Sequence, residues 1–271
     1  MAVFNSLTFD GQNSLDYGIY ITGEAVYDAP EREVEMINVP GRNGALAIDQ
    51  GRFQNISVEY KAGTFGADHS EYASKMRDFR NVLASRFNYK RITDSYHPDE
   101  FRLGLFRSGL EATPTHYSSA GEFNVTFDCK PQRYLLSGTE EVEFTADGSI
   151  TNPTLFASNP VLIVEGNGTV QIGDYIVAIS GNTTDLWIDS ELFEYFIPGA
   201  NPEPLTDEFL DNITDEMGFN IEVVKGSIVP RPSGATVNFA NHEYPKIAPG
   251  ANAVYIDGIT SLTIIPRWWM I

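Results

Sequence analysis

The side chains best suited to metal binding or acid–base catalysis are few and scattered along this sequence. The histidines form no HExxH or HxH motif and are never within four positions of one another, so the spacing of a histidine metal site is absent. They are His69, His97, His116 and His242. His97 has acidic neighbours in Asp94, Asp99 and Glu100, but Pro98 favours an exposed turn at that point. We expect no metal site.

Nucleophiles and phosphate-binding loops are equally poorly represented. The single cysteine, Cys129, allows no disulfide within the chain and is too little for a structural zinc site. No GxSxG elbow, P-loop or dinucleotide-binding fingerprint occurs. The nearest glycine cluster is Gly166-Asn167-Gly168, which we interpret as a hairpin turn between two strands. The sequence therefore predicts a protein that is not an enzyme and has no cofactor.

Carboxylates are numerous, and one group has helical spacing. Asp207, Asp211 and Asp215 recur every four residues, next to Glu208 and Phe209, in a segment with the apolar period of a helix. Such a set can in principle bind calcium, but no EF-hand spacing accompanies it. A solvated acidic face, or one that binds a basic partner, fits these residues better.

The three tryptophans suggest a different kind of site. Trp187, Trp268 and Trp269 are suited either to stacking against a saccharide or to anchoring a core or an interface. Trp187 lies in the alternating run Leu186-Trp187-Ile188, where one face must be buried. Trp268 and Trp269 would point to opposite faces of a strand, so at most one of them is expected to be exposed.

The elements that position these residues differ between the two halves of the chain. In the first half, Phe123, Val125, Phe127 and Cys129 alternate with polar residues, which predicts a half-buried strand over 121–131. Shorter runs over 34–39, 53–61 and 101–107 predict further strands, and Asp10-Gly11 predicts a turn after the strand 7–9. Apolar residues at every third or fourth position predict one helix over 70–87, with Asp68 and Glu71 at its start.

The second half alternates short β-rich runs with glycine turns. The runs are 160–165, 169–173, 175–180, 185–189, 237–240, 253–256 and 262–265. Without βα alternation, these predict a β-sandwich of the jelly-roll or lectin type. The overall fold class is mainly β: an α+β N-terminal domain with one helix packed on antiparallel sheets, followed by this sandwich.

A lapse in the apolar pattern divides the chain. We predict an N-terminal domain over 1–136, a linker over 137–152 and a sandwich over 153–271, with a partly helical insertion at about 197–232.

The charge is as unevenly divided as the apolar pattern. The net charge is −19, and residues 134–224 contain no Lys or Arg but 17 acidic residues. An acidic surface disfavours ordinary nucleic-acid binding. The lack of a long apolar segment or a signal sequence, together with the single cysteine, predicts synthesis in a reducing cytoplasm and no membrane partner.

Several segments together resemble the distal tail protein (Dit) family of long-tailed, non-contractile phages. In the first half these are Pro40-Gly41-Arg42-Asn43-Gly44, the segment from Asp49 to Phe53, the helix and the run Arg91 to Pro98, then Phe127 to Gln132. In the second half, Ile188-Asp189-Ser190-Glu191 and the segment from Gly258 to Trp268 resemble that family's galectin-like domain. The resemblance extends from about Glu31 to the C-terminus.

This resemblance implies a structural virion protein and not an enzyme. It implies a hexameric ring formed by the N-terminal domain, which joins the tail tube to the tail-tip or baseplate apparatus for host adsorption and leaves a channel through which DNA passes transiently. The implied partners are further copies of the chain, the major tail tube protein, a tail-tip or tail-associated protein and a receptor-binding protein, in a phage or prophage tail made in the host cytoplasm.

Two site hypotheses accompany this interpretation, and one alternative function remains. Pro40, Gly41, Arg42, Asn43 and Gly44 form either a ring-contact loop or an ordinary hairpin turn. The acidic insertion is expected to contact a neighbouring tail protein. The alternative is a carbohydrate-binding module that recognises a host cell-wall saccharide through exposed aromatic residues of the second domain.

Overall fold

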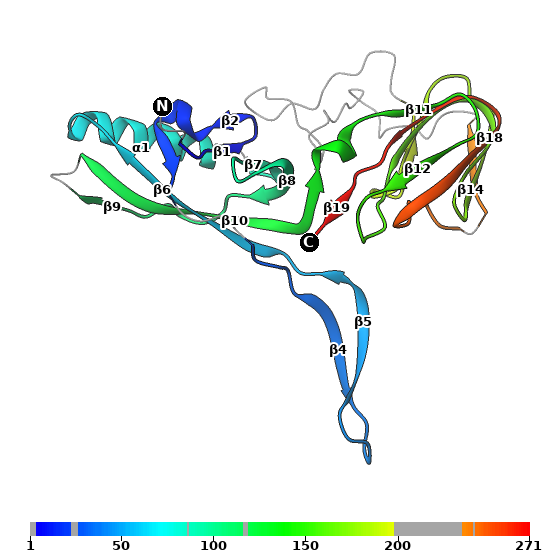
Figure 1. The fold of residues 1–271 in the computed structure, drawn as a ribbon, viewed down its shortest axis with the longest axis horizontal. Coiled ribbons are helices and arrows are strands. Elements are labelled where there is room, and N and C mark those ends of the chain that lie inside the picture. The colour runs from blue at the N-terminus through cyan, green and yellow to red at the C-terminus, as the bar shows by residue number, and fades with distance from the viewer. Residues whose placement is uncertain (1–3, 23–26, 86, 116–118, 198–234, 241) are drawn as a thin grey trace. The chain divides into compact units, whose positions relative to one another are not determined.

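A computed structural model describes residues 4–271 of the chain, except residues 23–26, 86, 116–118, 198–234 and 241. The described residues are mostly β-strand with one α-helix, which confirms the expected fold class. They form two compact units, one of residues Met1–Arg133 with Ile271 and the other of Tyr134–Met270 (Figure 1).

The first unit is built on one antiparallel sheet. Its strands follow the order β2-β1-β7-β8-β10-β6-β3, and β9 also pairs with β10. The strands are β1 (Leu7–Phe9), β2 (Gln12–Asn13), β3 (Ile19–Ile21), β6 (Ile56–Phe65), β7 (Lys90–Asp94), β8 (His97–Leu105), β9 (Ala112–Thr115) and β10 (Ala120–Leu135), with the 3-10 helix η1 (Ser14–Tyr17). Asp10 and Gly11 both have positive φ and join β1 to β2, as the turn signal predicts.

The helix α1 (His69–Ala84) covers the apolar face of this sheet. Its first turn is capped by Asp68, whose side chain accepts a hydrogen bond from the Glu71 amide at 2.9 Å. Tyr72, Met76, Phe79 and Leu83 form its buried stripe and pack in one core with the inward residues of β6 and β10. The helix is therefore confirmed, although it ends before Phe87, which is 83% exposed.

The predicted alternation in β10 is also confirmed. Phe123, Val125, Phe127 and Cys129 are all buried, while Glu122 and Asn124 between them are exposed. The other predicted strands of the first half are observed as β4 (Arg32–Asn38), β6 and β8. The run 53–61 begins on the last residue of a separate strand, β5 (Ala45–Phe53). Strands β4 and β5 pair only with each other, outside the main sheet.

The second unit is an antiparallel sandwich in which two long strands belong to both layers. Its strands are β11 (Val142–Phe144), β12 (Gly148–Asn152), β13 (Val161–Ile172), β14 (Tyr175–Ser180), β15 (Leu186–Asp189), β16 (Glu194–Phe196), β17 (Thr236–Phe239) and β18 (Gly250–Ile265), with the 3-10 helix η2 (Leu136–Thr139). The short strand β19 (Trp269–Met270) pairs instead with β10. The first half of β18 pairs with β12 and the second half with β11. Similarly, β13 pairs first with β15 and then with β14. Inward side chains from both layers form one core.

Two expectations for this half differ from the structure. Residues 137–152, expected to be a linker, contain η2, β11 and β12 and belong to the second unit, because Val142, Phe144 and Ile150 still supply apolar side chains to its core. Gly166-Asn167-Gly168 is not a hairpin turn. It is a bulge at which β13 shifts register against β18 and continues.

Close backbone approach explains the bulge glycines. A Cβ on Gly168, whose φ is +155°, would lie 1.9 Å from the carbonyl oxygen of Asp257. The Asn167 side chain accepts from the Asn182 amide at 2.7 Å and donates to the Asn182 carbonyl at 2.8 Å. The two glycines thus allow the backbones of β13 and β18 to approach each other closely at the bulge. The bulge interrupts the apolar pattern without ending either strand.

Candidate interaction surfaces

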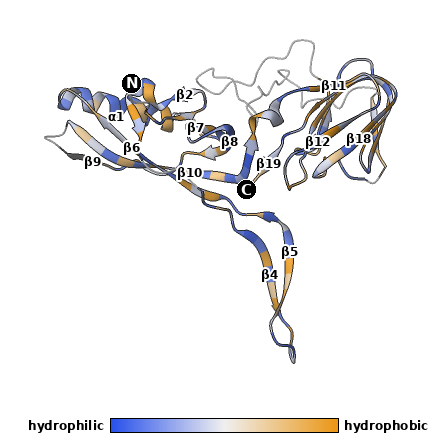
Figure 2. Ribbon diagram, viewed as in Figure 1, coloured by the Kyte–Doolittle hydropathy of each residue, from blue (hydrophilic) through white to orange (hydrophobic). Residues whose placement is uncertain are grey.

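The hairpin of β4 and β5, here called the arm, extends from the first unit with both faces exposed (Figure 1). Cross-strand pairs such as Ile37 with Leu46 and Met36 with Ala47 share a face. One face therefore carries Ile37, Val39, Leu46 and Ile48, and the other carries Val34 and Met36. These six apolar side chains are 38–61% exposed, and hydrophobic colour is visible along both arm strands (Figure 2).

A hairpin with this composition is not stable in water by itself. An isolated two-stranded hairpin is marginally stable in water, and apolar residues on both faces leave neither face suited to solvent. Among the described residues, β4 and β5 hydrogen-bond as strands only with each other. The arm therefore has the properties of a surface that is covered on assembly.

Ion pairs neutralise the charges near the base of the arm. Arg32 contacts Asp49 at 2.8 Å and lies over the ring of Phe53, while Arg52 pairs with Glu33. The Gly51 amide and then Arg32 lower the pKa of Asp49, and a hydrogen bond from Arg52 lowers the pKa of Glu33. Both carboxylates are thus held in the charged, paired form, although in full solvent such pairs add little stability.

The five residues of the candidate ring-contact loop form the tip of the arm. Gly41 and Gly44 have φ of +82° and +81°, and the Arg42 amide donates to the Val39 carbonyl at 3.2 Å. All five residues, Pro40 to Gly44, are exposed. Pro40–Gly44 is thus the hairpin turn, and its use as a contact surface remains a prediction.

A second surface, which sequence reasoning missed, is a cluster of three aromatic rings here called the aromatic patch. It consists of Phe4, Tyr20 and Phe65, with ring centroids 5.5 and 5.9 Å apart. Phe4 is 53% and Phe65 57% exposed. Tyr20 lies over Gly63, where a Cβ would approach its ring to 3.3 Å. No local pattern reveals the patch, because its members come from three distant segments.

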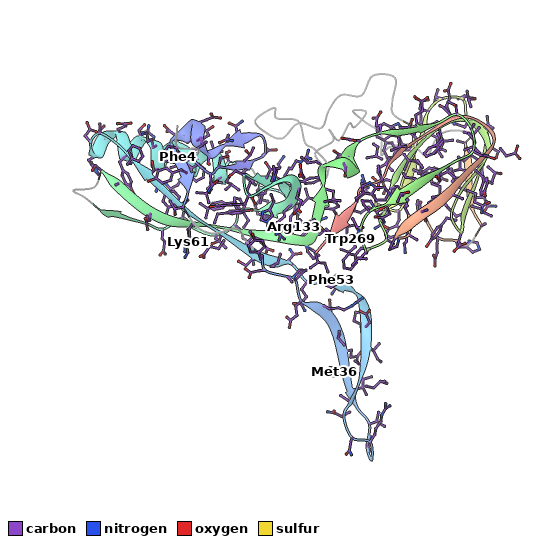
Figure 3. The ribbon with its side chains drawn as sticks, in the orientation of Figure 1. Phe4, Met36, Phe53, Lys61, Arg133 and Trp269 are labelled. Atoms are coloured by element: carbon purple, nitrogen blue, oxygen red, sulfur yellow. The ribbon has the colours of Figure 1, made fainter. Side chains whose placement is uncertain are left out.

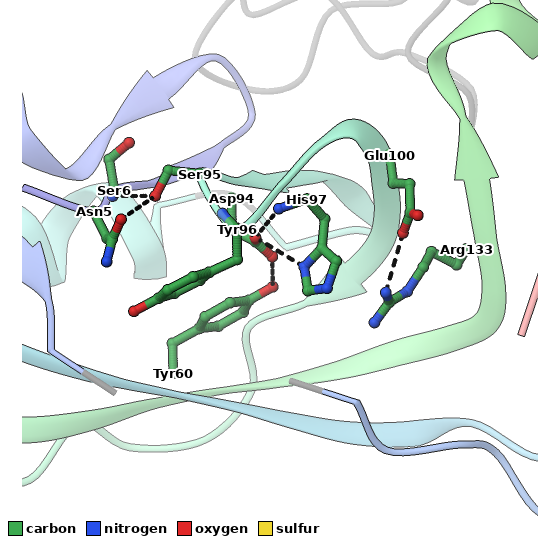
Figure 4. Close-up of polar contacts among 9 residues, drawn as sticks. All are labelled: Asn5, Ser6, Tyr60, Asp94, Ser95, Tyr96, His97, Glu100 and Arg133. Carbon is green, nitrogen blue, oxygen red and sulfur yellow. Dashed lines mark hydrogen bonds and ion pairs between the residues drawn. The ribbon is translucent and has the colours of Figure 1, made fainter. Parts of the chain in front are cut away.

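The Asp94 carboxylate organises the turn between β7 and β8 (Figure 4). Its oxygens accept hydrogen bonds from the amides of Tyr96 and His97 at 2.9 Å and from the Tyr60 hydroxyl at 2.9 Å, and the His97 ring contacts it at 3.1 Å. Burial, and then Asp94, raises the pKa of Tyr60. These contacts explain the Asp94–His97 segment as a structural turn.

Other reactive groups of the first unit are equally enclosed. Cys129 is fully buried, and burial raises the pKa of its thiol to about 12, so it is a core residue as predicted. Within the described part of the chain, no group of three or more His, Cys, Asp or Glu is placed to hold a metal ion. None of the helices described there is long and apolar enough to cross a membrane.

The tryptophans have separate environments in the second unit. Trp268 is 5% exposed and packs in the core, so it is not accessible to a saccharide. Trp269 stacks on Phe156 at 4.4 Å and donates to the Ala157 carbonyl at 2.9 Å. Trp187 lies beside Phe196 at 5.9 Å. The structure does not bring the three indoles into one platform.

The two motifs of the second half are joined by a buried ion pair. Arg267 donates to both carboxylate oxygens of Asp189 at 2.8 Å and approaches Glu191 at 3.7 Å. The Tyr134 hydroxyl donates to Glu191 at 3.5 Å, and the Arg267 amide donates to the Gly138 carbonyl at 2.8 Å. Motifs that are 78 positions apart in sequence are therefore one structural network.

The predicted partner-binding residues Asp207, Glu208, Phe209, Asp211 and Asp215 lie outside the described residues. The same holds for the insertion expected at about 197–232, from residue 198 onward.

Part of the chain matches a protein family, and its fold matches solved structures. Residues 13–129 match the family model of the phage tail protein RIFT-related domain. No curated protein sequence matches the chain significantly. The crystal structure of the Dit protein (gp 19.1) of phage SPP1, described as a paradigm of the hub adsorption apparatus in phages that infect Gram-positive hosts, is similar with a TM-score of 0.61 and 14% identity. The alignment covers 99% of this chain and 100% of that chain.

Two structures of the phage p2 baseplate in its activated conformation, with calcium and with strontium, are more distant. Their identities are 9% and 10% and their TM-scores 0.46 and 0.45, over 97% of this chain and 98% of theirs. Residues 13–129 thus match the phage tail protein RIFT-related domain and the whole chain has the fold of SPP1 Dit, which confirms the resemblance to siphophage distal tail proteins.

Proposed function

We propose that this chain is a structural protein at the distal end of a siphophage tail. Its first unit assembles into a hexameric ring that joins the tail tube to the tail-tip apparatus and leaves a central channel for DNA. The neighbours of the ring are the major tail tube protein on one side and a tail-tip or tail-associated protein on the other, with a receptor-binding protein attached outside. The protein resides in the virion and has no catalytic role.

The exposed arm is the observation that carries this proposal. A hairpin with apolar side chains on both faces needs a partner, and a ring supplies one for every copy because each subunit both gives and receives the same contact. The tail protein domain over residues 13–129 includes the whole arm, so the surface that needs covering lies in the part of the chain with the family match.

A carbohydrate-binding module is the weaker alternative. Of the three tryptophans considered for it, Trp268 is buried and the other two already have aromatic neighbours. We therefore do not advance it as a second function.

Light scattering on the full-length protein tests the ring. We expect about 180 kDa for six copies of the 30.0 kDa chain, or twice that mass for two stacked rings. The variant Ile37→Asp/Leu46→Asp places charges on one apolar face of the arm and should be monomeric. Leu155→Asp, at a residue 89% exposed in the second unit, is the matched control and should still assemble. A wild-type chain that stays monomeric at high concentration contradicts the proposal.

A further inference from the structure

The arm and the aromatic patch lie at opposite ends of the same strand. The arm ends at Phe53, and β6 begins three residues later at Ile56 and ends at Phe65 in the patch. Ten residues of β-strand measure about 33 Å. Figure 3 labels Met36 and Phe53 on the arm and Phe4 at the far end of the sheet. In the structure the arm leaves β6 at one end and extends away from the patch of its own chain at the other (Figure 1).

Arm and patch are chemically complementary. The arm face with Ile37, Val39, Leu46 and Ile48 is aliphatic, and the patch presents two half-exposed rings. Charges of both signs border the patch. Lys75 lies 5.8 Å from the Phe65 ring but is paired with Glu71 at 2.7 Å, and the exposed Glu122 lies opposite Gly63. Lys61 is exposed two residues before Gly63. On the arm, Glu35 shares the face of Ile37, and its carboxylate accepts a hydrogen bond from the Gln50 side chain at 3.3 Å. Glu35 thus accompanies the apolar face and is available to pair with Lys61, while the main complementarity is apolar.

The lengths of the arm and of strand β6 also agree. The nine residues of β5 measure about 30 Å, close to the length of β6. An arm is therefore about as long as the strand that separates its own base from its own patch, so it has the reach to contact the patch of an adjacent copy.

We propose that the Ile37–Leu46 face of each arm docks on the Phe4–Tyr20–Phe65 patch of a neighbouring copy of this chain. The contact is heterologous, because arm and patch are different surfaces, and repetition of such a contact generates a ring when the rotation between copies closes. This proposal rests on the ring proposed above and adds to it the specific pair of surfaces that makes the ring.

Disulfide trapping tests this pairing directly. The native thiol, Cys129, is buried, so only the cysteines introduced on the surface are accessible to oxidation. The variant Leu46→Cys/Phe65→Cys gives each copy one cysteine on the arm and one in the patch. Under mild oxidation with copper phenanthroline, we expect a ladder of covalent species from dimer to hexamer on a denaturing gel without reductant.

Controls separate this contact from accidental collisions. Leu46→Cys or Phe65→Cys alone provides one surface thiol per chain, so cross-linking must stop at the dimer. Leu46→Cys/Phe87→Cys places the second thiol on a residue 83% exposed after the helix, away from the patch, and should also give no ladder. Both residues of the test pair are on the surface, so neither substitution removes a core side chain.

The outcomes distinguish the two proposals. A ring-sized mass by light scattering without a ladder beyond the dimer in Leu46→Cys/Phe65→Cys overturns the arm–patch contact and leaves the ring standing. An equally long ladder in the Phe87 control overturns the contact as well, because trapping would then be unspecific. A protein that is monomeric before oxidation overturns both.

Discussion

Arg267 holds both carboxylate oxygens of Asp189 at 2.8 Å, and the side chains of the pair are only 3% and 6% exposed. The same carboxylate accepts hydrogen bonds from the amides of Glu191 and Leu192, so every part of the turn after β15 depends on it. Arg267 itself has a φ of +54°, an unfavourable value for a residue with a side chain. The bidentate ion pair fixes this backbone conformation just before the buried Trp268.

The first prediction concerns this ion pair. Asp189→Asn keeps the shape and the acceptor for both amides but removes the bidentate counter-charge of the buried guanidinium and leaves it Glu191 at 3.7 Å, so we expect a loss of about 3 kcal/mol in the free energy of unfolding of the second unit. All three tryptophans lie in that unit, so urea titration followed by tryptophan fluorescence reports it selectively. Ser261→Ala, which removes one exposed hydrogen bond, should shift stability by less than about 0.5 kcal/mol. Equal shifts for the two variants would contradict the role of the ion pair.

Local sequence patterns predicted the elements in which one face is buried against a core. The period of the helix and the alternation of β10 follow directly from burial of Tyr72 to Leu83 and of Phe123 to Cys129. Both patterns hold because each element meets a single core on one side.

The features that were missed depend on contacts between distant segments. The bulge at Gly166 to Gly168 looks like a turn locally and is explained only by the approach of Asp257. The patch joins Phe4, Tyr20 and Phe65, which no window of sequence contains together. The apolar run of β4 predicted a strand, but nothing local indicates that its partner is only β5 and that both faces remain exposed.

A second prediction concerns the bulge. Gly168→Ala places a methyl group against the Asp257 carbonyl at a φ that residues with side chains rarely adopt, so we expect a loss of about 3 kcal/mol or more in the second unit. Gly250→Ala is the control, because its φ of +84° brings backbone strain while nothing lies within 4 Å of the added carbon. It should cost about 1 kcal/mol. If the two variants unfold at the same urea concentration, by tryptophan fluorescence, close approach is not what selects glycine at the bulge.

The third prediction concerns the Asp94 turn. Asp94→Ala removes the acceptor of three hydrogen bonds in a partly buried site, so the first unit should lose about 2–4 kcal/mol. The helix α1 is the one α-helix of the described residues, so circular dichroism at 222 nm follows the unfolding of this unit. The neighbouring Ser95 makes hydrogen bonds to Ser6 and Asn5 that are exposed to solvent. In Ser95→Ala the first unit should therefore lose about 1 kcal/mol or less in the free energy of unfolding. A smaller loss for Asp94→Ala than for Ser95→Ala would exclude Asp94 as the organiser of the turn.

The last prediction is a loss of stability of the first unit at alkaline pH, caused by Cys129. Burial raises the pKa of this thiol from 9.0 to about 12, so between these values the unfolded chain releases the proton and the folded chain retains it. The unfolded state then binds fewer protons, and the free energy of unfolding falls with rising pH by about 1.4 kcal/mol per pH unit. Below pH 9 both states are protonated and the thiol contributes no pH dependence.

The variant Cys129→Ala separates this effect from the other groups that titrate in the same range. Its loss of packing is the same at every pH, but it has no thiol to ionise. Between pH 9 and pH 11 the wild-type protein should therefore lose about 2 kcal/mol more than Cys129→Ala in urea titrations followed at 222 nm. Burial and Asp94, the largest causes of the raised pKa of Tyr60, act in both proteins, so most of the Tyr60 contribution cancels in the comparison. Parallel pH profiles would contradict the prediction, because they would mean that this thiol, buried on β10 in the core of the first unit, ionises as readily in the folded unit as in the unfolded chain.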